Sequence, residues 1–317
     1  MKQWLAAGLV AASVGFPAHA GEPFSFVALG DMPYNLPADY AKFDRLVERI
    51  NAEGPAFSIH IGDIKSGAWP CDDATFQAIR DRFDAFDAPL FYTPGDNEWT
   101  DCHRAAAGGF DPLERLSAVR RMFFAAAESH GRASKSYRRQ SDLSPEHGEM
   151  VENAIWRHQD VLFATVHVVS SNNGLERSPA AVAEFLARDA ANLDWIARAF
   201  REAAETDARA VVVAMHANPI FEAEKPWDYA NSGFKRTITA LSAGASAFGR
   251  PVLIVHGDFH TFRLDQPLKG PDGKVLKQVW RLEVMGASDV HAVEVEVRPE
   301  DPGVFAFRPL IVAGNLD

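Results

Sequence analysis

Short apolar runs alternate along the chain with segments whose apolar residues recur at helical spacing. Runs at 24–29, 56–61, 89–93 and 252–255 predict buried strands. Between the first two, Phe43, Leu46, Val47 and Ile50 fall on one face of a helix. Repeated strand and helix units with glycine at the strand exits indicate parallel pairing, with helices covering the sheet faces. The pattern therefore predicts an α/β fold.

Acidic residues and histidines follow these strands. The residues at predicted strand ends are Asp31, Asp63, Asp96 with Asn97, His216 after a strand at 210–215, Asp258 and His260. Taken singly, a Gly-Asp pair after a strand is a common turn or helix-cap signal. Side chains at the carboxyl ends of neighbouring parallel strands, however, converge on one crevice. Oxygen and nitrogen donors brought together in this way predict a site for zinc, iron, manganese or cobalt.

The second half of the chain adds two helix starts and then changes its pattern. Proline follows a capping residue at Asp111-Pro112 and at Ser178-Pro179, which predicts two helices. Beyond residue 260 the apolar pattern is strand-like only, and we expect antiparallel strands that complete the sheets. The polar segment 130–149 predicts a loop or small insertion whose basic cluster (Arg132, Lys135, Arg138, Arg139) either is solvated or meets a phosphate.

The first twenty residues have a separate prediction. They combine a positive start, an apolar run and Ala18-His19-Ala20, which is typical of a secretory signal peptide. We therefore expect residues 1–20 to be removed and residues 21–317 to form one domain, exported to the periplasm or secreted. No later stretch is long and apolar enough to cross a bilayer, so we expect no membrane anchor after cleavage.

Net charge and cysteine content limit the kinds of ligand and the compartment that fit this chain. The chain carries a net charge of −11, which becomes −12 without Lys2. This acidity argues against non-specific nucleic-acid binding, which needs a basic face. A small anionic substrate remains compatible, because bound metal ions would reverse the local field. The two cysteines, Cys71 and Cys102, follow neighbouring strands, and in an exported protein they predict a disulfide.

The ordered motifs resemble those of the calcineurin-like metallophosphoesterase superfamily. The matching blocks are Gly30-Asp31, Gly62-Asp63, Gly95-Asp96-Asn97-Glu98, His216 and Gly257-Asp258-Phe259-His260. The superfamily's pattern is Asp-x-His, Gly-Asp, Gly-Asn-His-Asp/Glu, a lone His and Gly-His-x-His. The resemblance extends over nearly all of residues 21–317. It implies a four-layer α/β/β/α sandwich of mixed sheets with a two-metal site.

Carried over by position, the resemblance gives roles to single residues. Asp31 and His260 would bind the first metal, His216 the second, and Asp63 would bridge both. In the third block a gap-free match puts Asp96 at the position of the metal-binding Asn and Asn97 at that of a catalytic His. A shift of one residue would instead keep Asn97 as the ligand, and the sequence leaves both alignments open.

Two blocks depart from the superfamily's pattern. Pro33 stands where the first block has its His and cannot bind a metal, whereas the adjacent Tyr34 could supply a phenolate oxygen. In the last block Asp258 replaces the first His, and His256 precedes the glycine instead, so either residue is a candidate ligand. The leaving oxygen needs a proton donor, for which His103, Tyr34 and a metal-bound water are the candidates.

We expect from this resemblance an exported hydrolase of phosphate mono- or diesters that acts on a small phosphorylated substrate. Two ions of manganese, iron or zinc would stabilise charge on the attacking and leaving oxygens and lower the pKa of a bound water to about 7. Two alternatives stay open. One is a degenerate member that binds a ligand or partner without turnover, and the other is a hydrolase of a pyrophosphate or phosphosulfate bond. The sequence does not predict the oligomeric state.

Overall fold

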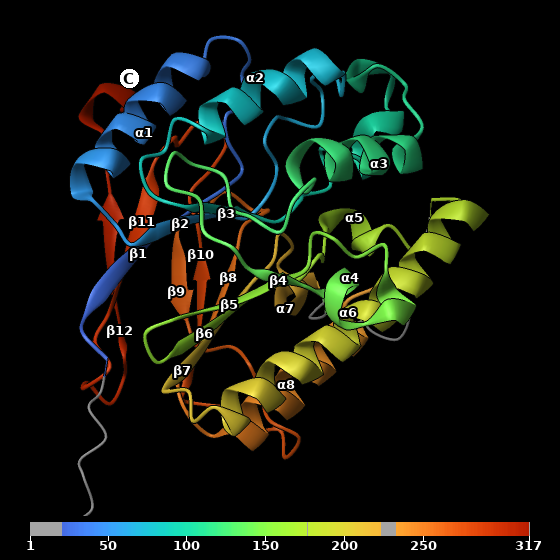
Figure 1. Ribbon diagram of the computed structural model, residues 1–317. Helices are drawn as coiled ribbons and strands as arrows, with labels where there is room; N and C mark the ends of the chain where they lie inside the picture. The colour runs from blue at the N-terminus through green and yellow to red at the C-terminus, as the bar shows by residue number, and fades with distance from the viewer. Residues whose placement is uncertain (1–20, 176, 223–232, 317) are drawn as a thin grey trace, which may run out of the picture.

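The chain is folded into four layers, in which two sheets lie face to face and helices cover both outer faces (Figure 1). The structure is a computed structural model that describes residues 21–175, 177–222 and 233–316. The predicted signal peptide lies outside the described residues. No helix of the described part is long and apolar enough to cross a membrane.

The first sheet contains five strands in the order β12-β11-β1-β2-β3. Its strands are β1 (Phe24–Leu29), β2 (Phe57–His60), β3 (Leu90–Tyr92), β11 (Ala292–Val297) and β12 (Phe305–Leu310). The strands β1, β2 and β3 are parallel, so their carboxyl ends lie at one edge. Strand β11 adds antiparallel to β1, and β12 antiparallel to β11.

The second sheet contains seven strands in the order β4-β5-β6-β7-β8-β10-β9. These are β4 (Arg138–Arg139), β5 (Ala154–His158), β6 (Val161–Thr165), β7 (Ala210–Ala214), β8 (Val252–His256), β9 (Arg263–Asp265) and β10 (Val279–Glu283). Strands β6, β7, β8 and β10 run parallel, whereas β4, β5 and β9 pair antiparallel with their neighbours.

Helices cover each sheet on its outer face (Figure 1). The helices are α1 (Tyr40–Glu53), α2 (Asp73–Phe83), α3 (Pro112–Phe123), α4 (Gln140–Leu143), α5 (Ser170–Asn173), α6 (Pro179–Glu205), α7 (Pro219–Glu222) and α8 (Lys235–Phe248). Helices α1, α2 and α3 share an apolar core with the first sheet, and α6 and α8 share one with the second. A third core, which includes Phe57, Phe91 and Phe163, fills the space between the sheets.

The predicted four-layer sandwich of mixed sheets is therefore confirmed. The two predicted helix starts are confirmed as well, because Asp111 caps α3 through the amide of Glu114 and Ser178 caps α6 through the amide of Ala181. The C-terminal strands differ in one respect from the expected antiparallel pairing. Strand β9 occupies the sheet edge, and β10 enters between β9 and β8, so that β10 is parallel to β8.

The segment 130–149 forms a short strand and two short helical turns at the edge of the second sheet. Its arginines are paired: Arg132 with Asp87, Arg138 with Glu202, and Arg139 with Asp142. The basic cluster is thus largely neutralised within the fold.

The predicted disulfide between Cys71 and Cys102 is present and fully buried. Its two sulfurs lie 3.5 and 3.6 Å from the carbonyl oxygen of Asn97. It therefore ties the loop that follows β2 to the loop that follows β3, directly beneath a predicted site residue.

We predict that replacing both cysteines by alanine lowers the free energy of unfolding by roughly 3–4 kcal/mol, because the crosslink closes a loop with a sequence separation of 31 residues. Urea unfolding of the oxidised wild type and of the Cys71→Ala/Cys102→Ala protein measures the difference. Equal unfolding midpoints for the two proteins would show that the crosslink does not stabilise the fold.

Candidate metal centre

Five strand ends from both sheets meet at one place and deliver acidic residues and histidines to it. Asp31, Asp63 and Asp96 follow the parallel strands β1, β2 and β3, while His216 and Asp258 follow the adjacent strands β7 and β8. Two groups of residues each have ligand atoms that all lie within 4.8 Å of one another. The first group is Asp31, Asp63 and His216, and the second is Asp96, His216 and Asp258. His216 belongs to both groups, so the two candidate metal sites adjoin.

The backbone at this edge is unusual for residues with side chains. Four residues have positive φ: Asp31 at 54°, Asp63 at 53°, Asp258 at 83° and His260 at 60°. Such conformations cost free energy for residues other than glycine and cluster at functional sites. They turn each side chain from its strand end into the shared crevice.

Two glycines make room for the carboxylates. A Cβ atom at Gly95 would lie 2.1 Å from Oδ1 of Asp63, and one at Gly257 would lie 2.0 Å from Oδ2 of Asp31. Any larger residue at either position would collide with a candidate ligand atom. This explains why glycine precedes the acidic residue in the third and last blocks.

His216 is oriented by a backbone hydrogen bond. Its Nδ1 donates to the carbonyl oxygen of Ile61 at 3.1 Å, so Nε2 faces the carboxylates, 2.9 Å from Asp96 and 3.5 Å from Asp63. A backbone partner on one ring nitrogen is the arrangement that fixes a metal-binding histidine in proteins. In the absence of a metal ion, Nε2 is protonated and donates a hydrogen bond to Asp96.

Burial and charge shift the acidity of the cluster strongly. Burial raises the pKa of Asp31 and of Asp63 well above the usual range, although the charge on His216 opposes it. Burial would also lower the pKa of His216, but the surrounding carboxylates outweigh it and raise that pKa well above its usual value. Burial acts to raise the pKa of Asp96, yet the hydrogen bond and charge of His216 hold it at about 2. Buried carboxylates that take up protons are a donor set suited to a divalent cation.

Tyr34 connects several of the candidate residues. Its hydroxyl donates to Oδ2 of Asp63 at 2.5 Å and lies 3.1 Å from both Nδ2 of Asn97 and Nε2 of His260. Asn97 also binds Asp63 twice, through its backbone amide at 3.0 Å and its side-chain amide at 2.5 Å. His260 also approaches a second candidate ligand, because its Nε2 lies 3.8 Å from Oδ1 of Asp31.

In the third block, the structure brings Asp96 to the histidine and turns Asn97 toward Asp63. Oδ1 of Asp96 lies 2.9 Å from Nε2 of His216, while the Asn97 side-chain amide donates to Asp63 and Tyr34, and the assignment of either residue as the ligand stays a prediction.

The other two candidates, His256 and His103, belong to neither group of candidate ligand atoms. In β8, Leu253 and Val255 face the core between the sheets and Val252 and Ile254 face the helices, so alternation places His256 on the helix side. Its Nδ1 contacts the carbonyl oxygen of Gly257, and its Nε2 is buried without a hydrogen-bond partner among the described residues. The exposed His103 contacts the carbonyl oxygen of Thr100.

Several residues of the site had no assigned role in the sequence analysis. Oε1 of Glu98 accepts hydrogen bonds from the amides of Ile64 and Gly95 and so braces the loops after β2 and β3. Burial lowers the pKa of the buried Lys65, and the negative charges of Glu98 and Asp63 oppose this lowering. Glu98 lies within the third block and Lys65 two residues after Asp63. Their position next to predicted ligands is the sequence signal that could have assigned both residues to the site. Ser171, whose hydroxyl donates to Asp96 at 3.1 Å, comes from a distant loop with no such signal.

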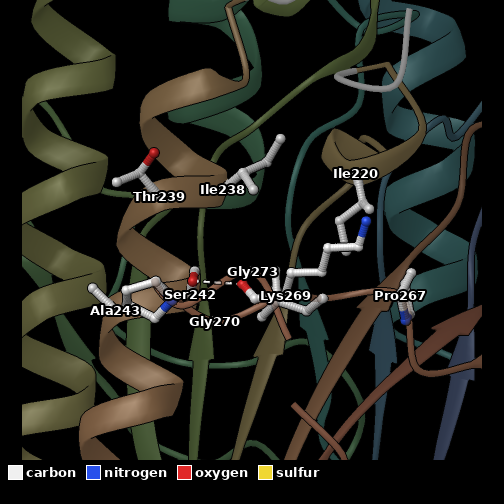
Figure 2. A pocket seen from close by; sticks show the side chains of 11 residues that line it. Ile220, Ile238, Thr239, Ser242, Ala243, Pro267, Lys269, Gly270 and Gly273 are labelled. Atoms are coloured by element: carbon white, nitrogen blue, oxygen red, sulfur yellow. Dashed lines mark hydrogen bonds between the residues drawn. The ribbon is translucent and has the colours of Figure 1, made fainter. Parts of the chain in front are cut away.

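A larger cavity lies elsewhere and lacks this chemistry. It has a volume of about 470 Å³ and lies between α8 and the connection from β9 to β10 (Figure 2). Ser242 donates to the carbonyl oxygen of Lys269 at its wall, and its described lining contains no carboxylate or imidazole. We therefore place the candidate functional site at the strand ends.

No protein-family model matches the chain, and no curated protein matches its sequence. Solved structures do match. A dimetal phosphatase from Danio rerio superposes with a TM-score of 0.55 at 12% identity, over 92% of this chain and 99% of that one. GAP50, described as the anchor in the inner membrane complex of Plasmodium, gives 0.51 at 10% identity, over 92% and 89%. The purple acid phosphatase PPD1 from yellow lupin gives 0.47 at 12% identity, over 93% and 55%.

At these identities the comparisons establish the fold. The chain has the α/β sandwich fold of the calcineurin-like metallophosphoesterases, as its motifs led us to expect, and the acidic cluster lies at its strand ends.

We predict that a divalent metal ion stabilises the protein more at pH 8 than at pH 5.5. The raised pKa of His216 gives the metal-free fold stability that is present below pH 6.5 and lost as pH rises through the folded pKa. The raised pKa values of Asp31 and Asp63 act in the same direction, because protonated carboxyls favour the fold and ionisation weakens it. Asp96 stays ionised across this range. Melting temperatures with and without Mn²⁺ at both pH values measure the effect.

A metal ion replaces the protons that these groups lose, so the rise in melting temperature should be larger at pH 8. The Asp63→Asn protein serves as the control and should show little rise at either pH. An equal rise at both pH values in the wild type would contradict the assignment of these groups as ligands.

Proposed function

We propose that the protein is an exported, metal-dependent phosphoesterase that hydrolyses phosphate mono- or diesters of small molecules at a two-metal site. The observation that carries this proposal is the sharing of the buried His216 between two groups of carboxylates at the strand ends. The fold, with a dimetal phosphatase among its structural neighbours, supports the same class of reaction.

The donor set fits two adjacent cations. Asp31, Asp63 and His260 would hold one, and Asp96, His216 and Asp258 the other. Asp63, whose Oδ1 lies 3.5 Å from Nε2 of His216, would bridge the two. All six offer oxygen or imidazole nitrogen, which suits manganese, iron or zinc. When bound, such ions supply Lewis-acid stabilisation of charge on the phosphoryl oxygens.

The chain's own residues would position the substrate and move a proton. Asn97 and Tyr34 hold Asp63 in one orientation through their hydrogen bonds. Burial and the neighbouring carboxylates raise the pKa of Tyr34 well above its usual value, so its hydroxyl keeps its proton. We infer that Tyr34, which contacts Asp63, is better placed than the exposed His103 to give a proton to a leaving oxygen.

A second candidate function is binding without turnover. It is favoured by the absence of an imidazole at Pro33 and, in the gap-free match, at Asn97, where the superfamily's pattern has one. GAP50, which has the same fold, is described as an anchor. Metal-stimulated hydrolysis of any phosphate ester separates the two functions.

The proposed compartment is the periplasm or the exterior. It rests on the leader-like residues 1–20 together with the disulfide between Cys71 and Cys102, since such bonds persist in oxidising compartments. The acidic net charge of −11 supports the absence of non-specific nucleic-acid binding.

We predict that Asp63→Asn lowers kcat/KM for aryl phosphates by about a hundredfold or more, because it removes a negatively charged candidate ligand that we propose bridges the two sites. Initial rates with Mn²⁺, before and after chelation, measure the loss. The matched control is Asp81→Asn, which makes the same chemical change at an exposed position of α2 and should keep the wild-type rate. Full activity of Asp63→Asn would refute the bridging role.

A further inference from the structure

A cavity of about 220 Å³ opens beside the candidate metal centre. Its walls come from the loop after β3 (Trp99, His103), the start of α3 (Leu113) and the start of α6 (Ala181, Glu184). None of the assigned metal ligands lines it. An engineered cavity of ~150 Å³ accepts benzene, so this one has room for a single substituted ring.

Two segments of the chain that contact Asp96 also line the cavity. Trp99 follows Asp96 by three residues, which limits their Cα atoms to about 11 Å, and its backbone amide donates to the carbonyl oxygen of Asp96 at 3.2 Å. The second loop binds Asp96 through Ser171 and lines the cavity at Gly174. The cavity and the candidate metal centre are therefore neighbours in the fold.

One wall is apolar and rigid. Trp99 is buried and packs in a small cluster with Leu116, Val169 and Leu113. The guanidinium of Arg188 lies 5.2 Å from the centroid of the Trp99 ring and is itself bonded to the backbone oxygen of Asn173. The indole Nε1 of Trp99 has no hydrogen-bond partner among the described residues. The wall thus includes an aromatic ring that its neighbours hold in place.

A positively charged side chain, that of Arg177, lies at the wall of the cavity. Arg177 lines the cavity, is half-buried, and forms no hydrogen bond or ion pair with another described residue. Burial lowers the pKa of Arg177, and the negative charges of Asp101 and Asp96 oppose this lowering. A half-buried, unpaired guanidinium is a strong binding group for a phosphate oxygen.

We propose that this cavity binds the alcohol part of the ester, with an aromatic or compact apolar group against Trp99, while Arg177 binds a phosphoryl oxygen. The assignment rests on the proposed function and names its substrate class: small aryl or comparably compact apolar phosphate esters. Leu113 and Ala181 then determine which alcohols fit.

Phosphonates test the assignment without requiring turnover. Isothermal titration of the Mn²⁺-loaded wild type should show phenylphosphonate binding at least about tenfold more tightly than methylphosphonate, because only the phenyl group reaches the apolar wall. Ala181→Phe fills the cavity and should reduce the preference to about twofold. Ala183→Phe is the matched control on the exposed side of α6 and should keep the preference.

Two further variants keep the test decisive. Leu113→Ala removes part of the wall and should weaken phenylphosphonate binding while leaving methylphosphonate binding unchanged. Arg177→Gln should weaken both ligands by a similar factor, about tenfold, because both carry the anionic group. Absence of a phenyl preference in the wild type, or its survival in Ala181→Phe, would overturn the assignment.

The outcome is separable from that of the proposed function. A phenyl preference that Ala181→Phe removes, without hydrolysis of any ester, would retain the cavity assignment and reject the enzyme. Hydrolysis of phenyl phosphate and methyl phosphate with equal kcat/KM would retain the enzyme and reject the cavity assignment. Failure of both phosphonates to bind would reject the cavity assignment.

Discussion

The fold depends on compensating the charge of several carboxylates that are buried at one point. Asp31, Asp63 and Asp96 are all buried at the ends of β1, β2 and β3, where like charges repel and water cannot screen them. Among the described residues, His216 and the buried Lys65 contribute positive charge that compensates part of this repulsion. A bound divalent cation would complete this compensation, so the same residues that create the electrostatic difficulty define the function.

The scaffold holds this cluster against its own repulsion. Glu98 joins the loops after β2 and β3 by accepting amides from both, and the Cys71–Cys102 disulfide crosslinks the same two loops below Asn97. Gly95 and Gly257 leave space for carboxylate oxygens that any side chain would displace. Rigid support of this kind maintains the left-handed backbone at Asp31 and Asp63, which an isolated loop would not retain.

Local sequence signals were enough to predict several strands and the acidic residues at their ends. Apolar runs located β1, β2 and β8, and an acidic residue after each gave the convergence once parallel pairing was assumed. What the sequence could not give depends on distant contacts. Ser171 reaches Asp96 from a loop 75 residues away in the chain, and the parallel partner of β10 is set by β9 taking the sheet edge. The direction of His256 follows from strand alternation, but only once the exact strand and its two cores are known.

The most direct test of this account is the metal content per chain of the protein purified without chelator, measured by elemental mass spectrometry. The account predicts close to two transition-metal ions per chain in the wild type and a clear loss in His216→Ala, because this imidazole belongs to both groups of candidate ligands. No bound metal, even after manganese, iron and zinc have been offered, would contradict it.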